Sequence, residues 1–142
     1  MNHFHQIAAL LERYGLDAML LTGEANRFYA SGFHSAGTDG VALVTRKKAY
    51  YFTDSRYTEA AGRCVQGAEI REVGPGRGYA VLLTEALGEQ KVCRLGFEEA
   101  YMTVLEHERY RKALPCELVP ATELLQQLRT VKDAEELDAM VA

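Results

Sequence analysis

The chain has 142 residues, of which 48% are hydrophobic and 25% are charged, so it is long enough for one ordinary hydrophobic core and too short for two. Its formal net charge of −4 leaves no broad basic surface to neutralise phosphates, which argues against nucleic acid as a partner. No apolar run approaches the roughly 20 residues of a membrane-spanning helix, and the first residues are typical of a mature helix rather than a signal peptide. We therefore expect a cytoplasmic protein with no membrane partner.

The first half of the sequence predicts a helix, a buried strand and a β-hairpin. The helix should have Asn2 as its N-cap, end at Gly15 and bury residues at helical spacing, namely Phe4, Ile7, Ala8, Leu11 and Tyr14. Residues 17–22 (DAMLLT) are typical of a buried strand. Residues 40–45 and 49–53 are rich in β-branched and aromatic residues and flank the basic turn RKK, so they predict a hairpin with a solvated tip.

In the second half, predicted strands alternate with predicted helices. Asp54 or Ser55 should cap a helix whose inward positions are Tyr57, Ala60, Ala61, Cys64 and Val65. Thr103 and Glu106 form a capping box at the start of a later helix. After the first of these helices we expect strands at residues 69–73, 91–97 and 117–119. Helices at residues 78–87 and 103–113 should separate these strands, and a last helix should follow Pro120 and end near Arg129. Alternation of this kind after a hairpin predicts an α/β domain with a mixed sheet covered by helices.

The sequence offers no metal site and no catalytic constellation of its own. The three cysteines, Cys64, Cys93 and Cys116, are far apart and form no CxxC pair, so we expect buried small residues rather than a disulfide framework or a zinc site. None of the four histidines belongs to an HExxH pattern. The glycine-rich segment GPGRG at residues 74–78 lacks the spacing of a dinucleotide or phosphate loop, so we interpret it as a plain connection.

Two stretches remain as candidate functional segments, NRFYASGF at residues 26–33 and TDSRY at residues 53–57. The first predicts a short helical turn that ends at Gly32, followed by an exposed loop, FHSAGT, over residues 33–38. Such a loop can offer a ligand the His34 imidazole and an apolar face, and a mobile connection with a chance histidine is an equally weighted alternative. In TDSRY we expect mainly structural roles, with Arg56 held by a carboxylate.

The order of several motifs resembles the N-terminal domain of the creatinase and prolidase family, which includes Xaa-Pro aminopeptidases and Xaa-Pro dipeptidases. The motifs are NRFYASGF, VALVTRKKAYYFTDSRYTEAA, LGFEEAYMT and LLQQLRTVKDAEELDAM, and the resemblance covers essentially the whole chain. It implies a ribonuclease H-like, three-layer α/β domain over residues 1–131. Residues 132–142 would begin a linker helix toward a larger pita-bread catalytic domain, which agrees with the short apolar stripe near the end of the chain.

The resemblance also implies which domain carries out catalysis. In the family the catalytic domain holds two divalent metal ions, which we expect to be Mn, Co or Zn, on Asp, Asp, His, Glu and Glu ligands. This chain would hold none and would contain no catalytic residue. It would contact its own C-terminal catalytic domain, and in a homodimer it would lean over the other subunit's active site, where a peptide with proline at its second position is cleaved.

Residue by residue, the resemblance implies two groups. The substrate-binding residues would lie in and beside the loop that follows the Gly-Phe pair: Phe33, His34, Ser35, Thr38 and Asp39. The structural residues would be Asn26, Tyr29, Gly32, Asp54, Arg56 and Tyr57.

Two other functions fit the same residues. The chain could be a stand-alone module, derived from the family, that binds a small molecule or a protein. It could also be the front domain of a creatinase-like amidinohydrolase, which cleaves a non-peptide C–N bond without needing metal. The groups that separate these functions would lie in the catalytic domain.

Overall fold

A computed structural model describes residues 3–34 and 40–130 and contains one mixed six-stranded sheet. The strand order is β4-β3-β2-β1-β5-β6. The pairs β1–β2 and β2–β3 are antiparallel, and the other three neighbouring pairs are parallel. The strands are β1 (Ala18–Leu21), β2 (Gly40–Thr45), β3 (Ala49–Thr53), β4 (Ala68–Glu72), β5 (Arg94–Phe97) and β6 (Glu117–Pro120). The predicted hairpin and the α/β class are confirmed.

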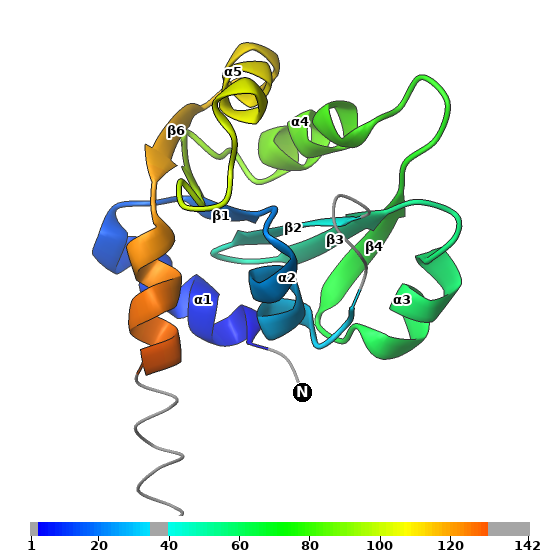
Figure 1. The fold of residues 1–142 in the computed structure, drawn as a ribbon, viewed down its shortest axis with the longest axis horizontal. Helices are drawn as coiled ribbons and strands as arrows, with labels where there is room; N and C mark the ends of the chain where they lie inside the picture. Colours follow the sequence, from blue (N-terminus) through cyan, green and yellow to red (C-terminus); the bar gives the residue numbers. More distant parts are fainter. Residues whose placement is uncertain (1–2, 35–39, 131–142) are drawn as a thin grey trace, which may run out of the picture.

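Helices cover both faces of the sheet, which gives three layers (Figure 1). One face carries α1 (Phe4–Leu11) with the short 3-10 helix Glu12–Tyr14, α2 (Glu24–Ser31), α3 (Thr58–Cys64) and a helical segment over residues 122–130. The opposite face carries α4 (Tyr79–Glu89) and α5 (Val104–Ala113). The sequence therefore predicted the type and order of these elements, and α2 is a longer helix than the single turn expected.

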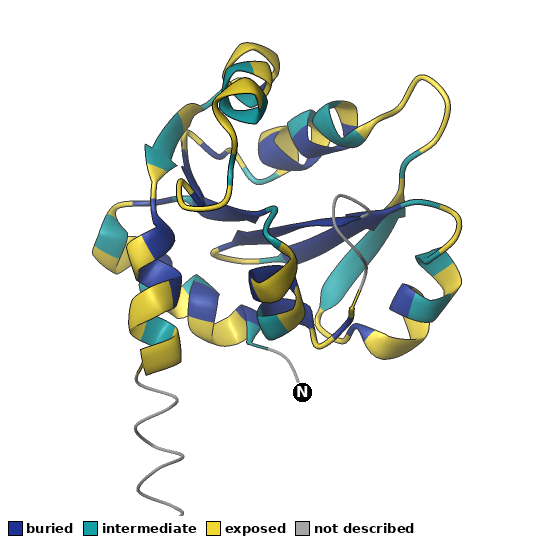
Figure 2. Ribbon diagram, viewed as in Figure 1, coloured by how far each residue is buried: buried dark blue, intermediate teal, exposed yellow. Residues whose placement is uncertain are grey.

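The sheet has a hydrophobic core on each side because alternate residues of a strand face opposite ways. In β1, Met19 and Leu21 join the core under α1 and the 122–130 helix, whereas Ala18 and Leu20 join the core under α4. The central strands are accordingly the most buried part of the molecule (Figure 2). Full burial of a large aliphatic or aromatic side chain contributes about 1.5–3 kcal/mol, so these two cores are the main source of stability.

The helix ends follow local signals in the sequence. Gly15 and Gly32 have φ angles of 69° and 72°, a left-handed conformation that glycine adopts without a Cβ clash, and each closes a helix as predicted. The Thr103 side chain accepts a hydrogen bond from the Glu106 N–H, and the Glu106 side chain accepts one from the Thr103 N–H, so the predicted capping box of α5 is confirmed.

Two predicted N-caps are wrong. The N-cap of α1 is His3, whose ring contacts Tyr29 and does not cap the helix. Asn2 lies outside the described residues. The N-cap of α3 is Tyr57, and no side chain caps this helix. Asp54 lies three residues earlier and its carboxylate instead accepts the Arg56 N–H at 3.0 Å, so it closes the turn before the helix.

The expected burial of the three cysteines is also wrong. Cys64 and Cys93 are exposed, and Cys116 is half-buried. Cys64 is the last residue of α3 and stays exposed although Ala61, one turn earlier, is buried. Cys93 immediately precedes the first residue of β5, the exposed Arg94. Small size alone therefore did not decide where these side chains lie.

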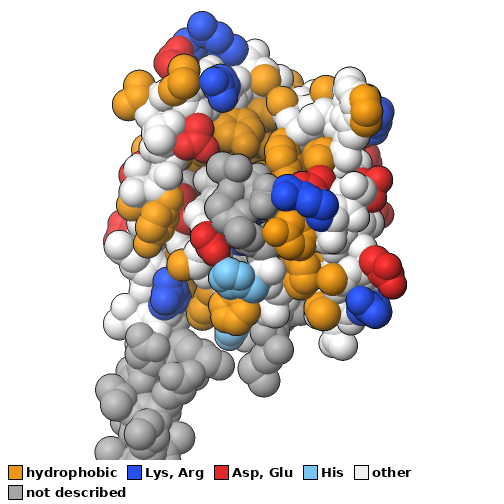
Figure 3. Space-filling view, turned by 45° about the vertical axis from the view of Figure 1, so that its right-hand side comes forward, with side chains coloured by type: hydrophobic (Ala, Val, Ile, Leu, Met, Phe, Trp, Pro, Cys, Tyr) orange, Lys and Arg blue, Asp and Glu red, His pale blue; other side chains and the backbone are white. Residues whose placement is uncertain are grey.

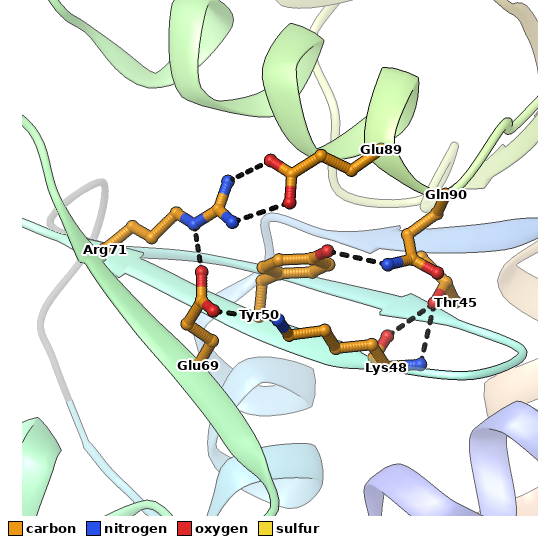
Figure 4. A network of polar contacts seen from close by, with 7 residues as sticks. All are labelled: Thr45, Lys48, Tyr50, Glu69, Arg71, Glu89 and Gln90. Atoms are coloured by element: carbon orange, nitrogen blue, oxygen red, sulfur yellow. Dashed lines mark hydrogen bonds and ion pairs between the residues drawn. The ribbon is translucent and has the colours of Figure 1, made fainter.

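A network of charged side chains joins the hairpin, β4 and α4 (Figure 4). Arg71 on β4 donates two hydrogen bonds of 2.8 Å to Glu89 on α4 and a further one to Glu69. Lys48, at the hairpin turn, donates to Glu69 at 2.8 Å. The pKa of Glu69 is lowered by its hydrogen bonds from Lys48 and then Arg71. The turn is thus tied to its neighbours rather than only solvated.

Candidate functional site

The predicted substrate-binding segment begins where α2 ends. The Gly32 N–H donates to the Phe28 carbonyl at 2.8 Å, and the left-handed backbone of Gly32 then redirects the chain. The next two side chains diverge, because Phe33 is 8% exposed in the core and His34 is exposed at the surface. Ser35, Thr38 and Asp39 lie outside the described residues.

Three surface residues on and just after α2 form what we call the His34 cluster: Glu24, Phe28 and His34. Nε2 of His34 lies 3.1 Å from Oε1 of Glu24, and the His34 ring meets the Phe28 ring edge to face at 5.7 Å between centroids. In the lower centre of Figure 3, histidine, acidic and hydrophobic side chains lie next to one another. The carboxylate orients the imidazole, and the cluster presents this imidazole and one apolar ring to solvent.

Phe33 supports this segment from beneath. Its ring makes edge-to-face contacts with Tyr51 on β3, at 5.8 Å, and with Tyr57 before α3, at 6.3 Å. The Phe33 N–H also donates to the Ser31 hydroxyl at 3.1 Å. The aromatic packing fixes the direction in which the chain leaves α2, and a substrate contact by the Phe33 ring stays a prediction.

The buried side of α2 carries a polar network centred on Glu98. Its carboxylate is fully buried and accepts hydrogen bonds from the Thr22 N–H at 2.8 Å, the Gly23 N–H at 3.0 Å and Asn26 Nδ2 at 2.7 Å. Asn26 Oδ1 in turn accepts a hydrogen bond from Arg129 Nη1 at 3.2 Å. The Glu98 carboxylate thus joins the start of α2 to the end of β5, and Asn26 links it to the helix over residues 122–130.

Arg27, on the buried side of α2, connects this helix to two strands of the sheet. It is 1% exposed, and its Nη1 donates to the Thr22 carbonyl at 3.1 Å and the Gly40 carbonyl at 2.6 Å. Thr22 follows β1, and Gly40 begins β2 immediately after the loop. A buried guanidinium that bridges these two carbonyls ties α2 to the end of β1 and to the start of β2.

Tyr29 links the N-terminus to the C-terminal helix. Its ring stacks on His3 at 4.0 Å, its carbonyl oxygen lies 2.6 Å from Nδ1 of His3, and the Arg129 guanidinium lies 5.6 Å from its ring centroid. His3 is therefore partly buried against α2. A structural role for Tyr29 stays a prediction.

Asp54, Arg56 and Tyr57 occupy the turn between β3 and α3. Arg56 Nη2 lies 2.7 Å from Asp54 Oδ2, so the carboxylate partner expected for Arg56 is its own neighbour Asp54. The hydrogen bonds from Arg56 lower the pKa of Asp54. The Arg56 guanidinium also lies 5.4 Å from the Tyr57 ring centroid. The structure brings this group close to Phe33 through the Tyr57 ring.

Sequence reasoning assigned no role to Glu98 or Arg27. A signal for Glu98 did exist, because an acidic residue follows the apolar stretch of β5 directly, where a free carboxylate would be costly to bury without donors. No such signal marked Arg27, whose partners are backbone carbonyls at distant positions in the chain.

Within residues 3–34 and 40–130, no three His, Cys, Asp or Glu side chains converge in a way that could hold a metal ion. The residues of this part of the chain therefore do not fit a dinuclear metal centre, and we derive no chemical step through a metal here. Over the same residues, no helix has both the length and the hydrophobicity needed to cross a bilayer.

Residues 4–131 match the family description Creatinase/Prolidase N-terminal domain. The chain belongs to this family. Among curated proteins, it is 38% identical over 130 residues to the uncharacterized peptidase YqhT of Bacillus subtilis, an alignment that covers 90% of this chain and 35% of YqhT. The creatinase/prolidase resemblance of the sequence is thus confirmed.

Solved structures of family members share the fold. A Xaa-Pro dipeptidase from Bacillus anthracis is 29% identical with a TM-score of 0.80, and the match covers 89% of this chain and 34% of that one. The N-terminal domain of the cytoplasmic peptidase PepQ from Mycobacterium tuberculosis is 30% identical with a TM-score of 0.75, and the match covers 89% of this chain and 97% of that one. The chain therefore spans about a third of the longer relatives and nearly the whole of a relative solved as a separate N-terminal domain.

Proposed function

We propose that this chain is the non-catalytic front domain of a metal-dependent Xaa-Pro peptidase and that it supplies dimer contacts and part of the substrate pocket. Membership of the creatinase/prolidase N-terminal family carries the proposal, because the longer relatives are named peptidases and the chain spans only about a third of their length. The substrate would be a peptide with proline at its second position. The metal ions, Mn, Co or Zn, would be held by the C-terminal catalytic domain.

The His34 cluster is the part of this chain that we assign to the substrate wall. His34 and Phe28 are exposed, and they stand where the chain enters residues 35–39, which include Ser35, Thr38 and Asp39. The Glu98 network, Arg27 and the Phe33 packing support this edge from inside the domain. We also propose a cytoplasmic location, in keeping with the relative that is named a cytoplasmic peptidase.

The division of labour can be tested on the isolated chain. Incubation of residues 1–142 with an Xaa-Pro peptide and Mn²⁺ should release no N-terminal residue, because none of the described residues forms a metal site. Metal-dependent release of that residue, retained through purification to constant specific activity, would contradict the proposal. A contaminating peptidase is controlled for by an identically purified His34→Ala variant, which should leave contaminating activity unchanged.

The role of His34 requires the whole protein with its catalytic domain. Removing an imidazole that contacts substrate should lower kcat/KM by about tenfold, which corresponds to about 1.4 kcal/mol of lost transition-state stabilisation. His5→Ala is the matched control, since His5 is exposed on α1. Equal kcat/KM for the native protein and His34→Ala would contradict a substrate contact by the His34 cluster. The family assignment would not be affected.

A further inference from the structure

A hollow of about 470 Å³ lies on the other side of β1 from the Glu98 network. It is bounded by Thr22 and Val41 at the sheet, Tyr79 at the start of α4, and Glu106, Arg109 and Tyr110 on α5. Figure 3 shows hydrophobic side chains gathered in a hollow in the upper half of this face. The volume is within the range of small-molecule sites, and the place agrees with the tendency of α/β proteins to bind ligands at the carboxyl ends of parallel strands.

Two hydroxyl groups at the hollow have unused hydrogen-bonding capacity. The hydroxyls of Thr22 and Tyr110 make no hydrogen bond with any residue in the described ranges, although the backbone groups of Thr22 are bonded to Glu98 and Arg27. Tyr110 is half-buried against the core under α4. A hydroxyl in such a position both donates and accepts, so it can serve either end of a polar ligand.

The same hollow has one group of each charge, a helical turn apart on α5. Arg109 forms neither a hydrogen bond nor an ion pair with the part of the chain that the structure describes, unlike Arg111, which Glu108 holds at 3.0 Å. Glu106 uses Oε1 to accept the Thr103 N–H at 3.2 Å, and Oε2 has no partner among the described residues. An unpaired guanidinium suits a carboxylate, and a carboxylate oxygen suits an ammonium group.

We propose that this hollow binds a free amino acid or dipeptide with an apolar side chain, whose carboxylate pairs with Arg109 and whose ammonium group pairs with Glu106. The hydroxyls of Thr22 and Tyr110 add hydrogen bonds, and Val41 with the Tyr79 ring forms the apolar wall. The two charges distinguish this ligand class from a simple anion or a neutral aromatic compound. The described residues that line the site all belong to this domain, whereas the proposed substrate wall is completed by a partner subunit.

The binding test uses the isolated chain, since N-terminal domains of relatives have been solved as separate chains. ¹⁵N-labelled residues 1–142 are titrated with L-phenylalanine, N-acetyl-L-phenylalanine, which lacks the ammonium group, and L-phenylalaninamide, which lacks the carboxylate. We expect saturable shift changes at the amides of Val41, Tyr79 and Tyr110, with the two blocked compounds binding at least about tenfold more weakly.

Substitutions then locate the contacts. Arg109→Gln should weaken L-phenylalanine binding by at least about tenfold, and Tyr110→Phe should weaken it less, whereas Arg13→Gln, an exposed arginine on the opposite side of the sheet, should leave it unchanged. No saturable binding up to millimolar ligand would overturn the proposal. Shift changes confined to other residues, or equal affinity in native protein and Arg109→Gln, would overturn it too. Any of these failures leaves the proposed peptidase role untouched.

Discussion

Asn26 Nδ2 donates a hydrogen bond of 2.7 Å to Oε2 of Glu98, although the two residues are 72 positions apart in the sequence. Asn26 is 3% exposed and also accepts the hydrogen bond from Arg129. Asn26→Ala should therefore destabilise the domain by about 1–3 kcal/mol, because it leaves a buried oxygen of the Glu98 carboxylate without its donor. Urea denaturation measures this, with the exposed Gln126→Ala as a control that should change stability by no more than about 0.5 kcal/mol.

The pH dependence of stability should carry a signature of Glu98. Burial raises the pKa of Glu98 above its ordinary value of 4.5, while the hydrogen bonds from Asn26, Gly23 and Thr22 oppose this rise. The folded state then holds the Glu98 proton more tightly than the unfolded state does. The stability that this proton contributes is present below pH 4.5 and is lost as the pH rises through the raised pKa.

Comparison of the native protein with Glu98→Gln isolates this effect. Subtracting the free energy of unfolding of the variant from that of the native protein should give a difference that falls as the pH rises from 4 to 7. Glu108→Gln should give a smaller difference of opposite slope, because Arg111 lowers the pKa of Glu108. A difference that rises with pH for Glu98→Gln would mean that hydrogen bonding outweighs burial at this carboxyl group.

The network around Arg71 should contribute more than an ordinary surface ion pair. Arg71→Gln removes the two hydrogen bonds to Glu89 and the one to Glu69, and so it should lower Tm by about 3 °C. Arg63→Gln is the matched control, since the Arg63 pair with Glu59 is exposed and 3.9 Å long. Calorimetry that finds equal Tm changes for both variants would show that the network adds nothing beyond isolated pairs.

The cysteines should differ in reactivity. Burial, with a smaller contribution from nearby Cys93, raises the pKa of the Cys116 thiol to about 11, so only about one molecule in a thousand carries this thiolate at pH 8. Iodoacetamide at pH 8 should therefore alkylate the exposed Cys64 and Cys93 well before Cys116, as followed by peptide mass spectrometry. Equal labelling of the three sites in folded protein would contradict the burial of Cys116.

The elements with strong local signals could be predicted from the sequence. These signals are the β-branched and aromatic residues on each side of the hairpin turn, the glycines Gly15 and Gly32, and the capping box of Thr103 and Glu106. Each depends on residues within a few positions of one another. The predicted capping by Asp54 failed because an Asp before a helix can also close the preceding turn, and both patterns look alike in a sequence.

The supports of the candidate site could not be predicted in the same way. Arg27 acts through the carbonyls of Thr22 and Gly40, and Glu98 acts through groups more than 70 positions earlier, so only the fold brings them together. His34 was singled out correctly as an exposed residue, yet its contact with Glu24 depends on where α2 ends. The family could nevertheless be recognised, because its motifs occur along this sequence in the expected order.

The central claim, that this chain is the front domain of a metallopeptidase, is tested most directly by reading the coding DNA beyond the codon for Ala142. We predict an open frame that continues for on the order of 200 codons, the size of a further domain, and encodes the spaced Asp, Asp, His, Glu and Glu ligands of a dinuclear metal centre. A stop codon directly after Ala142 would contradict this claim and leave a stand-alone binding domain.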